Sequence, residues 1–532
     1  MATYTYGFLG LVITVVLYSY AKSFLKKRRR DLEAARRGCG PVPILKNKDP
    51  FGLSTFVSSL KATKDDRGPQ YVIDTMDSVG KDVHTVQVRL LDYSLIVTRD
   101  PENVKAMFAT QCGEFDIGAH RAKSFEPLLG VGIFTSTGEQ WKRSRALVRP
   151  QFAREQISDL DLEERHVQDM LSVLTKGKTD SKGWTNTVDL QPLFYNFTLD
   201  TATEFLYGHS THTQNPARRA QLPSLNGMDT PDRAKLSDHL DAGKYWIETR
   251  GAFWKWYWLI SSKDFDYHCK EIHKFVDWFV QVRLRGQKEK IQPAAQPGNK
   301  KKFILLDELA EHTQNPRELR NETLSVLTAG RDTTGALLGW VFYFLARNPR
   351  VLDKLRNIIL QEFGSNHVTS EISFVRLRSC SYLQYCINEA FRVAAVIPLN
   401  ERVCNRDTTL PRGGGPDGSK PIFITKGTQV LIASYAMQHR ADIWGQDVEE
   451  FKPERWEGRR VGWEFVPFGA GPRICLGQQF SLTETSYVIV RFLQRFDKIE
   501  NMEPPGRIRL HHAIENRSGT GVQVRLHEAS AY

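Results

Sequence analysis

The sequence is poor in cysteine for its length. Its 532 residues contain seven cysteines, an odd number, and no two of them form a Cys-x-x-Cys pair. The cysteines therefore predict neither a zinc site nor a disulfide framework, and they suit a reducing compartment. They stand at positions 39, 112, 269, 380, 386, 404 and 475.

Internal repeats and a phosphate-binding loop are also missing. The glycine-rich run Gly413–Gly418 is followed by a strand-like segment beginning at Pro421, and no helix follows it. Because a phosphate cradle needs a helix N-terminus directly after the glycines, this run is predicted to be an ordinary loop. The chain shows no nicotinamide-binding or flavin-binding module of its own.

Acidic residues are outnumbered by basic ones. Lys and Arg total 73 against 61 Asp and Glu, which gives a formal net charge of +12. Much of the excess lies in one cluster, residues 26–30, followed by Arg36 and Arg37. The charge is therefore concentrated beside the N-terminus, and we expect no nucleic-acid partner.

The N-terminus carries the one long apolar run. Between Tyr4 and Leu25 the only charged residue is Lys22. About 20 apolar residues span a bilayer as a helix, and a following positive cluster keeps the remainder on the cytoplasmic side. A cleaved signal peptide is the alternative, but no small-x-small site follows the run. We predict a single-pass anchor in the endoplasmic reticulum membrane.

This interpretation divides the chain into three parts. Residues 1–30 form the anchor with its basic flank, and residues 31–50 form a hinge around the run from Gly38 to Pro43. Residues 51–532 form the catalytic domain, on the cytoplasmic side.

Several secondary-structure elements follow from local patterns. Alternating residues predict strands at 86–90 and 93–97, and Asp100-Pro101-Glu102 is typical of a helix start. Residues 153–290 are predicted to be mostly helical. A single helix of about 30 residues fits the stretch from Pro316 to Asn348.

The strongest motif lies near the C-terminus, in the loop 468–477. Phe468, Gly471, Arg473 and Gly477 surround Cys475, and a helix-like run from 478 to 495 follows at once. A helix N-terminus favours negative charge and hence a thiolate. A lone Cys is otherwise most often a small buried hydrophobe.

The frame Phe-x-x-Gly-x-Arg-x-Cys-x-Gly resembles the haem-binding loop of the cytochrome P450 superfamily. The resemblance implies haem b as cofactor, with the Cys475 thiolate as the axial ligand of its iron. It also implies a mainly α fold with small β-sheets, here carrying an N-terminal transmembrane helix.

Ala329-Gly330-Arg331-Asp332-Thr333-Thr334 stands in the middle of the long predicted helix. A glycine inside a helix lowers its stability by on the order of 1 kcal/mol. Two explanations for Gly330 are therefore open, close packing of a neighbouring helix and access for oxygen and substrate. The run resembles the oxygen-activation motif of the family, which implies that Asp332 and Thr333 deliver protons during catalysis.

Two further groups of residues take roles from the same resemblance. Trp141 and Arg145 share one helix face and, with Arg402, would contact the haem propionates, although a solvent-facing Arg is the alternative. Phe468 and Arg473 complete the cofactor-binding set.

Glu389 and Arg392 are spaced to share a helix face, where a weak surface pair would be the default. The resemblance instead implies that they form a buried structural triad with Arg455. Ala329, Val396, Ile397 and Leu399 are the predicted substrate-pocket residues, and the segment 396–402 is expected to run along the haem as a strand.

The implied activity is oxygen insertion into a C–H bond, with electrons from a separate NADPH-dependent flavoprotein reductase. A cytochrome b5 is a further candidate partner. The runs 138–152, 200–208 and 413–418 resemble the fungal alkane and fatty-acid hydroxylase branch. One departure is that the branch more often has a His directly after the Met, whereas here Gln438 separates Met437 from His439. The expected substrate is a lipophilic long-chain fatty acid or n-alkane, oxidised at or near the chain end.

Three alternatives remain open. A sterol, an aromatic compound or a secondary metabolite could be hydroxylated by the same chemistry. A haem-thiolate isomerase or dehydratase needs no proton relay, and the Asp332-Thr333 pair argues against it. A non-catalytic haem sensor would consume no NADPH.

Overall fold

The computed structural model describes residues 27–529 with several gaps, together with seven positions nearer the N-terminus. The gaps are 92, 154–159, 176–178, 220–221, 223–228, 289–302, 366–368 and 370, and the additional positions are 14, 17, 18, 21, 22, 24 and 25. Most of the predicted anchor therefore lies outside the described residues. Within the described residues, no helix has both the length and the apolar character of a membrane span.

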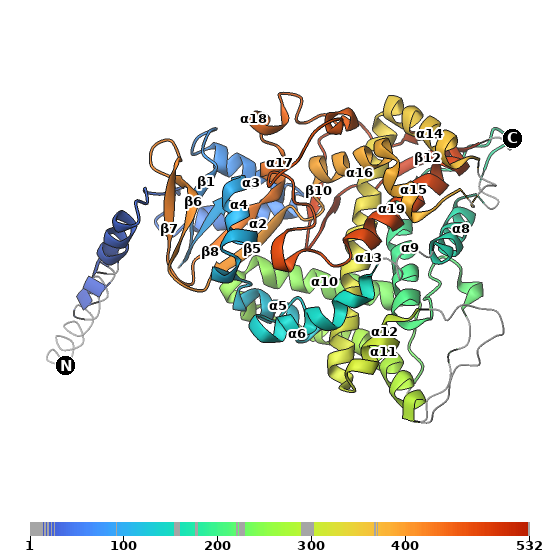
Figure 1. Ribbon diagram of the computed structural model, residues 1–532, viewed down its shortest axis with the longest axis horizontal. Helices are drawn as coiled ribbons and strands as arrows, with labels where there is room; N and C mark the ends of the chain where they lie inside the picture. Colours follow the sequence, from blue (N-terminus) through green and yellow to red (C-terminus); the bar gives the residue numbers. More distant parts are fainter. Residues whose placement is uncertain are drawn as a thin grey trace, which may run out of the picture. The chain divides into compact units, whose positions relative to one another are not determined.

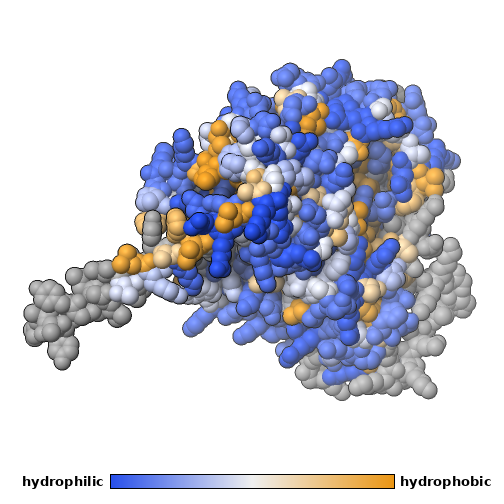
Figure 2. All heavy atoms as spheres, turned by 60° about the vertical axis from the view of Figure 1, so that its left-hand side comes forward, coloured by the Kyte–Doolittle hydropathy of each residue, from blue (hydrophilic) through white to orange (hydrophobic). Residues whose placement is uncertain are grey.

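The chain forms two compact units, which are described separately. The first contains residues 1–57, 72–116 and 400–433, and the second contains residues 58–71, 117–399 and 434–532. Two helices contribute residues to both, α2 (Leu53–Lys64) and α3 (Gly68–Asp77). Polar residues cover most of the face shown in Figure 2, and apolar residues form separate patches between them.

The first unit is built on a mixed sheet with the strand order β1-β2-β8-β5-β3 (Figure 1). Its strands are β1 (Thr85–Leu90), β2 (Tyr93–Thr98), β8 (Gln429–Ala433), β5 (Leu399–Cys404) and β3 (Phe115–Asp116). β1 pairs antiparallel with β2, and β2 pairs parallel with β8. The predicted strands at 86–90 and 93–97 are confirmed.

Two further elements of this unit were predicted from local sequence. Helix α4 (Pro101–Lys105) begins where expected, and the Asp100 carboxylate accepts from the backbone N–H of Glu102 at 2.9 Å. The hairpin of β6 (Thr408–Gly414) and β7 (Lys420–Ile424) contains the glycine-rich run. No helix follows that run, as predicted, but Gly413 and Gly414 end strand β6, so only residues 415–418 form the loop.

The second unit is mainly helical, as predicted. Its helices are α5 (Ala119–Leu129), α6 (Gly138–Val148), α8 (Asp161–Thr175), α9 (Leu190–Tyr207), α10 (Leu236–Ala252), α11 (Lys263–Lys288), α12 (Leu305–His312), α13 (Pro316–Arg347), α14 (Pro349–Phe363), α15 (Phe374–Ser379), α16 (Ser381–Ala394), α17 (Ser434–Gln438), α18 (Ala441–Trp444) and α19 (Gln478–Arg495). Small sheets complete it, formed by β4 (Val188–Asp189), β12 (Gln523–Glu528) and β9 (Phe496–Asn501), and by β10 (Leu510–His512) with β11 (Asn516–Ser518).

Helix α13 is the central packing element of this unit (Figure 1). It confirms the helix predicted from Pro316 and ends one residue earlier, at Arg347. Two of its glycines allow α9 to approach closely, because a Cβ on Gly335 would stand 2.9 Å from the Tyr195 ring and one on Gly339 would stand 3.0 Å from the Gln191 amide. Phe194 and Phe342 stack across this contact, with ring centroids 5.1 Å apart.

One expected strand is only partly present. β5 begins at Leu399, so Val396 and Ile397 precede it and are not in a strand. Val396 instead lies buried, and its carbonyl accepts from the backbone N–H of Asn516 at 2.8 Å. The reason is that α16 extends to Ala394 and Ala395 takes a left-handed conformation, which turns the chain before the strand can start.

Candidate functional site

The loop before α19 holds Cys475 at a surface. The backbone N–H of Cys475 donates to the Phe468 carbonyl at 3.0 Å, closing the loop. Gly469 and Gly471 have φ angles of +67° and +66°, a left-handed conformation in which a side chain would be strained. Both glycines are therefore required by the backbone, Gly471 as a residue of the motif and Gly469 as its neighbour in the loop, and the closed loop presents the Cys475 side chain outward.

Cys475 is the one exposed thiol among the seven cysteines, all of which the structure describes. It lines a cleft of about 930 Å³ within the second unit. The cleft is lined by Trp141, Arg145, Arg149, Pro150, Phe152, Ala153, Gly471, Pro472, Ile474, Cys475 and Leu476. The predicted residues Trp141, Arg145 and Cys475 thus share one cavity.

Opposing influences act on the Cys475 thiol. The Cys475 thiol is accessible from the cleft but is surrounded by protein atoms on its other sides, and this burial raises its pKa. A backbone hydrogen bond from Gly477 and the positive charge of Arg145 lower the pKa. The hydrogen bond and the positive charge would both favour the thiolate, which is the form of cysteine that binds a metal.

Helix α6 carries the aromatic and cationic wall of the cleft. Arg145 donates from Nη1 to the Ile474 carbonyl at 3.1 Å, which ties α6 to the Cys475 loop. The Arg473 guanidinium lies 4.3 Å from the centre of the Trp141 ring, and its Nη2 donates to the Ser136 carbonyl at 3.2 Å. Phe468 packs edge-on against Phe391, with centroids 5.1 Å apart.

Arg402 is the one predicted cofactor-binding residue outside the second unit. It lies in β5, is buried, and its guanidinium stands 4.8 Å from the centre of the Phe108 ring. Its Nη1 donates to the Asn400 side chain at 3.0 Å. Its predicted propionate contact stays a prediction.

Beyond its exposed first turn helix α13 is mostly buried, but one stripe in its middle is accessible. Val326, Ala329, Gly330 and Thr333 are half-buried, and their spacing of i, i+3, i+4 and i+7 places them on one face. No described atom outside the helix lies within 4 Å of the position that a Cβ on Gly330 would occupy. Close helix packing therefore does not explain Gly330, and the open face favours access for small molecules.

Asp332 and Thr333 differ in their surroundings. The Thr333 hydroxyl donates to the Ala329 carbonyl at 2.7 Å, on the accessible stripe. The Asp332 carboxylate is buried, with Oδ1 2.9 Å from Arg331 Nη1 and 3.5 Å from Lys244 Nζ. Burial raises the pKa of Asp332, while Lys244 and Arg331 act to lower it.

Lys244 is shared with a second buried carboxylate. Its ammonium lies 2.7 Å from Glu515, in the turn between β10 and β11. Burial acts to raise the pKa of Glu515, but Lys244 and Arg517 outweigh it and lower that pKa below its usual value. Lys244 lies closer to Glu515 than to Asp332, whose carboxylate is also paired with Arg331. Sequence reasoning missed this cluster because Lys244 and Glu515 are separated from Asp332 by long stretches of chain.

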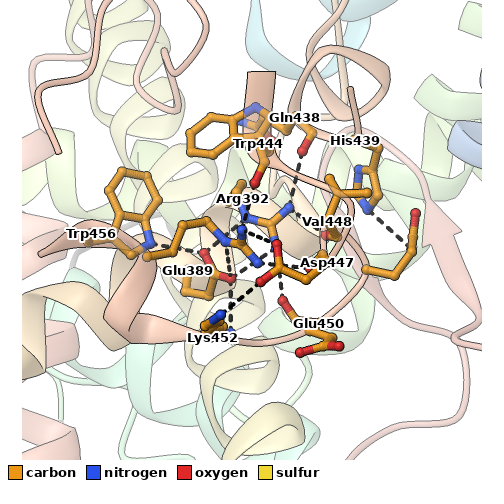
Figure 3. A network of polar contacts seen from close by, with 12 residues as sticks. Glu389, Arg392, Gln438, His439, Trp444, Asp447, Val448, Glu450, Lys452 and Trp456 are labelled. Carbon is orange, nitrogen blue, oxygen red and sulfur yellow. Dashed lines mark hydrogen bonds and ion pairs between the residues drawn. The ribbon is translucent and has the colours of Figure 1, made fainter. Parts of the chain in front are cut away.

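The predicted triad forms one buried network (Figure 3). Glu389 and Arg392 make two hydrogen bonds of 2.9 Å, and Arg455 Nε lies 3.2 Å from Glu389 Oε1. Glu389 also accepts from the Trp456 indole at 2.9 Å and from the Lys452 backbone N–H at 3.0 Å.

The network reaches further than three residues. Arg392 donates to three backbone carbonyls, those of Gln438, Val448 and Glu450, at 3.1, 2.7 and 3.0 Å. Asp447 pairs with Arg455 at 2.7 Å, a partner that the sequence motif did not identify. These bonds fix the segment that precedes the Cys475 loop.

The donors of the cleft fit the haem that the resemblance implies. A single exposed sulfur can ligate iron, and Arg145 and Arg149 supply positive charge for carboxylates such as haem propionates. Arg149 follows Arg145 by four residues, a helical spacing that could have identified it from sequence.

Comparisons with known proteins agree with this geometry. A family model described as Cytochrome P450 matches residues 52–510. Cytochrome P450 monooxygenase g430 of a Fusarium species is 43% identical over 517 residues, covering 97% of this chain and 89% of the relative. Cytochrome P450 52A4 of Candida maltosa is 43% identical over 454 residues, covering 84% and 81%.

A solved structure shows the same fold. The crystal structure of the cytochrome P450DA heme domain superposes with a TM-score of 0.73 at 19% identity, covering 93% of this chain and 99% of that one. The expected family and its fungal branch are confirmed. The chain belongs to the cytochrome P450 family and is a haem-dependent monooxygenase.

Proposed function

We propose that this monooxygenase hydroxylates long-chain fatty acids or n-alkanes at or near the chain end. The observation that carries the proposal is the accessible stripe of α13, where Val326, Ala329 and Gly330 offer apolar surface beside Thr333. Each buried CH₂ contributes about 0.8 kcal/mol, so a long chain binds such a surface with few polar contacts. The chain is also similar to fungal relatives of the 52A group, in agreement with the fungal branch that its motifs resemble.

The chain's own residues would divide the work as follows. Haem b, when bound, supplies the oxygen-activating chemistry. Cys475 would hold its iron, while Arg145, Arg149 and Trp141 would bind its edge. Asp332 would hold a proton at its buried carboxyl, and Thr333 would pass it on once its hydroxyl leaves the Ala329 carbonyl.

Electrons would come from an NADPH-dependent flavoprotein reductase, with a cytochrome b5 as an additional donor.

A chain-length series tests the substrate proposal. We expect hydroxylated products from fatty acids or alkanes of about 12 to 18 carbons, with affinity rising up to about fourfold per added CH₂. The measurements are product analysis with reductase and NADPH, and binding titrations followed by the haem spectrum. Products from a sterol or an aromatic compound alone would contradict the proposed substrate class.

The proton-delivery roles make a separate prediction. Thr333→Ala should retain haem and substrate binding but form at least about tenfold less product per NADPH consumed, since positioned proton transfer contributes about 10²–10⁴-fold. Thr328→Ala is the matched control, because Thr328 makes the same backward bond, to Leu324, but lies off the accessible stripe. Equal losses in both variants would show that the relay does not pass through Thr333.

The membrane anchor in residues 1–30 and the catalytic domain in 51–532 belong to the proposal as well. We expect that a chain lacking residues 1–30 keeps its haem and leaves the membrane fraction of the endoplasmic reticulum on washing with high salt. Ile44, Phe51, Leu53 and Val57 are exposed apolar side chains that would retain part of the protein at the bilayer surface. A folded truncated protein found wholly in the membrane pellet would exclude a single anchor.

A further inference from the structure

A second cluster of metal-ligating side chains lies in the helical unit, between α8 and the loop after α9. His166, Asp169 and His212 each offer one ligand atom, and these atoms lie within 4.8 Å of one another. His166 and Asp169 are three residues apart on α8, so they share one face of that helix. His212 comes from the loop, and the cluster therefore joins two separate segments.

The two histidines have ring nitrogens that lack hydrogen-bond partners. His166 Nε2 lies 2.6 Å from Glu204 Oε2 of α9, but the buried Nδ1 atoms of His166 and His212 have no partner among the described residues. A His166 that donates its Nε2–H to Glu204 carries its lone pair on Nδ1. A carboxylate behind a histidine in this way orients metal-binding imidazoles in proteins.

The loop is built to hold His212 in place. His212 has a φ angle of +46°, an unusual value for a residue with a side chain. Asp200 accepts hydrogen bonds from both flanking residues, at 2.6 Å from the Thr211 hydroxyl and 2.8 Å from the Thr213 N–H. Local strain fixed by neighbouring bonds is common at functional sites.

Asp169 is already oriented by other contacts. Its Oδ1 accepts from Asn215 Nδ2 at 2.9 Å, and Arg218 Nη1 lies 3.3 Å from Oδ1 and donates to Oδ2 at 3.4 Å. Arg218 is more than half exposed, so its charge is largely solvated at the rim. Arg165 likewise pairs with Glu204 Oε1 at 2.7 Å and leaves Oε2 to His166.

We propose that His166, Asp169 and His212 bind a Zn²⁺ ion that fastens the loop after α9 to α8. Two imidazole nitrogens and one carboxylate form a ligand set that suits Zn²⁺, with one position left for water. The site shares no residue with the Cys475 cleft, so it stands independently of the proposed substrate. Its role is to hold the fold, and it takes no part in oxygen chemistry.

Elemental analysis tests the proposal on the full-length haem protein, purified through a tag that contains no histidine. We expect about one zinc per haem iron, loss of that zinc on treatment with a chelator, and a lower unfolding temperature that added Zn²⁺ restores. His212→Gln should lose the zinc and keep the haem. His209→Gln is the matched control, because His209 is exposed and three residues away, and it should keep both.

The variant Glu204→Gln distinguishes between two interpretations of the cluster, a metal site and a metal-free network of buried hydrogen bonds. It keeps all three ligands but removes the carboxylate behind His166, so Zn²⁺ affinity should fall about 10- to 100-fold. The proposal is wrong if chelator-treated protein binds Zn²⁺ no more tightly than His212→Gln does, or if Zn²⁺ leaves its unfolding temperature unchanged. The cluster would then be a metal-free set of hydrogen bonds.

Discussion

Cys475→Ala should abolish haem incorporation. The other six cysteines are buried or half-buried, and none of them lines the cleft that holds Trp141 and Arg145, so no second thiol can replace the lost ligand. The measurements are the haem-to-protein ratio and the absorption spectrum of the reduced, CO-bound protein. We expect background haem content and no thiolate-type band.

Two further variants make this result decisive. Cys475→Ser keeps the size of the side chain, so it separates loss of the sulfur from collapse of the loop; it should fold but show no thiolate-type spectrum. Cys112→Ala removes a half-buried thiol outside the cleft and should retain the spectrum unchanged. A thiolate-type band in either variant at position 475 would end the assignment of the axial ligand.

The second large effect is expected at the buried network of Figure 3. Arg392→Leu should lower the free energy of unfolding by about 3–5 kcal/mol, because it leaves the Glu389 carboxylate buried beside an apolar side chain. It also removes donors from the backbone carbonyls of Gln438, Val448 and Glu450. Urea unfolding followed by tryptophan fluorescence, with haem content measured in parallel, checks this result.

A conservative variant and a surface control sharpen the test. Arg392→Lys keeps the positive charge, but a lysine ammonium cannot replace the planar guanidinium, whose Nε, Nη1 and Nη2 all donate hydrogen bonds. The unfolding midpoint of this variant should therefore lie between those of Arg392→Leu and the natural protein. Lys274→Met removes an exposed ion pair with Glu271 on α11 and should leave the midpoint unchanged. Equal midpoints for Arg392→Leu and the natural protein would contradict a bracing role.

Local sequence predicted those features whose cause is local. The Asp100 cap, the strand pair at 86–97 and the helix beginning at Gln478 depend on neighbouring residues, and each appears in the structure. The Glu389–Arg392 pair is also local, since its spacing already places both side chains on one face of α16.

Features that depend on the meeting of distant segments could not be predicted in this way. Lys244 lies between Asp332 and Glu515 only because α10, α13 and the β10–β11 turn converge. The strand expected from Val396 starts late because the left-handed conformation of Ala395 turns the chain first, and an alanine gives no signal of such a turn. Likewise, the lack of Cys-x-x-Cys pairs argued against a zinc site built from cysteines, but it gave no information about a site built from histidines on separate segments.

The two-sided character of α13 has an evolutionary consequence. Most of its side chains are locked into the core, and its glycines at 335 and 339 are fixed by the closeness of α9. Val326, Ala329 and Gly330 are only half-buried, and a Cβ at Gly330 would meet no atom within 4 Å. We therefore expect the packing of α13 to tolerate substitutions at Ala329 and Gly330 better than elsewhere, so that sequence variation among descendants of this chain would be concentrated on one narrow strip of a single helix.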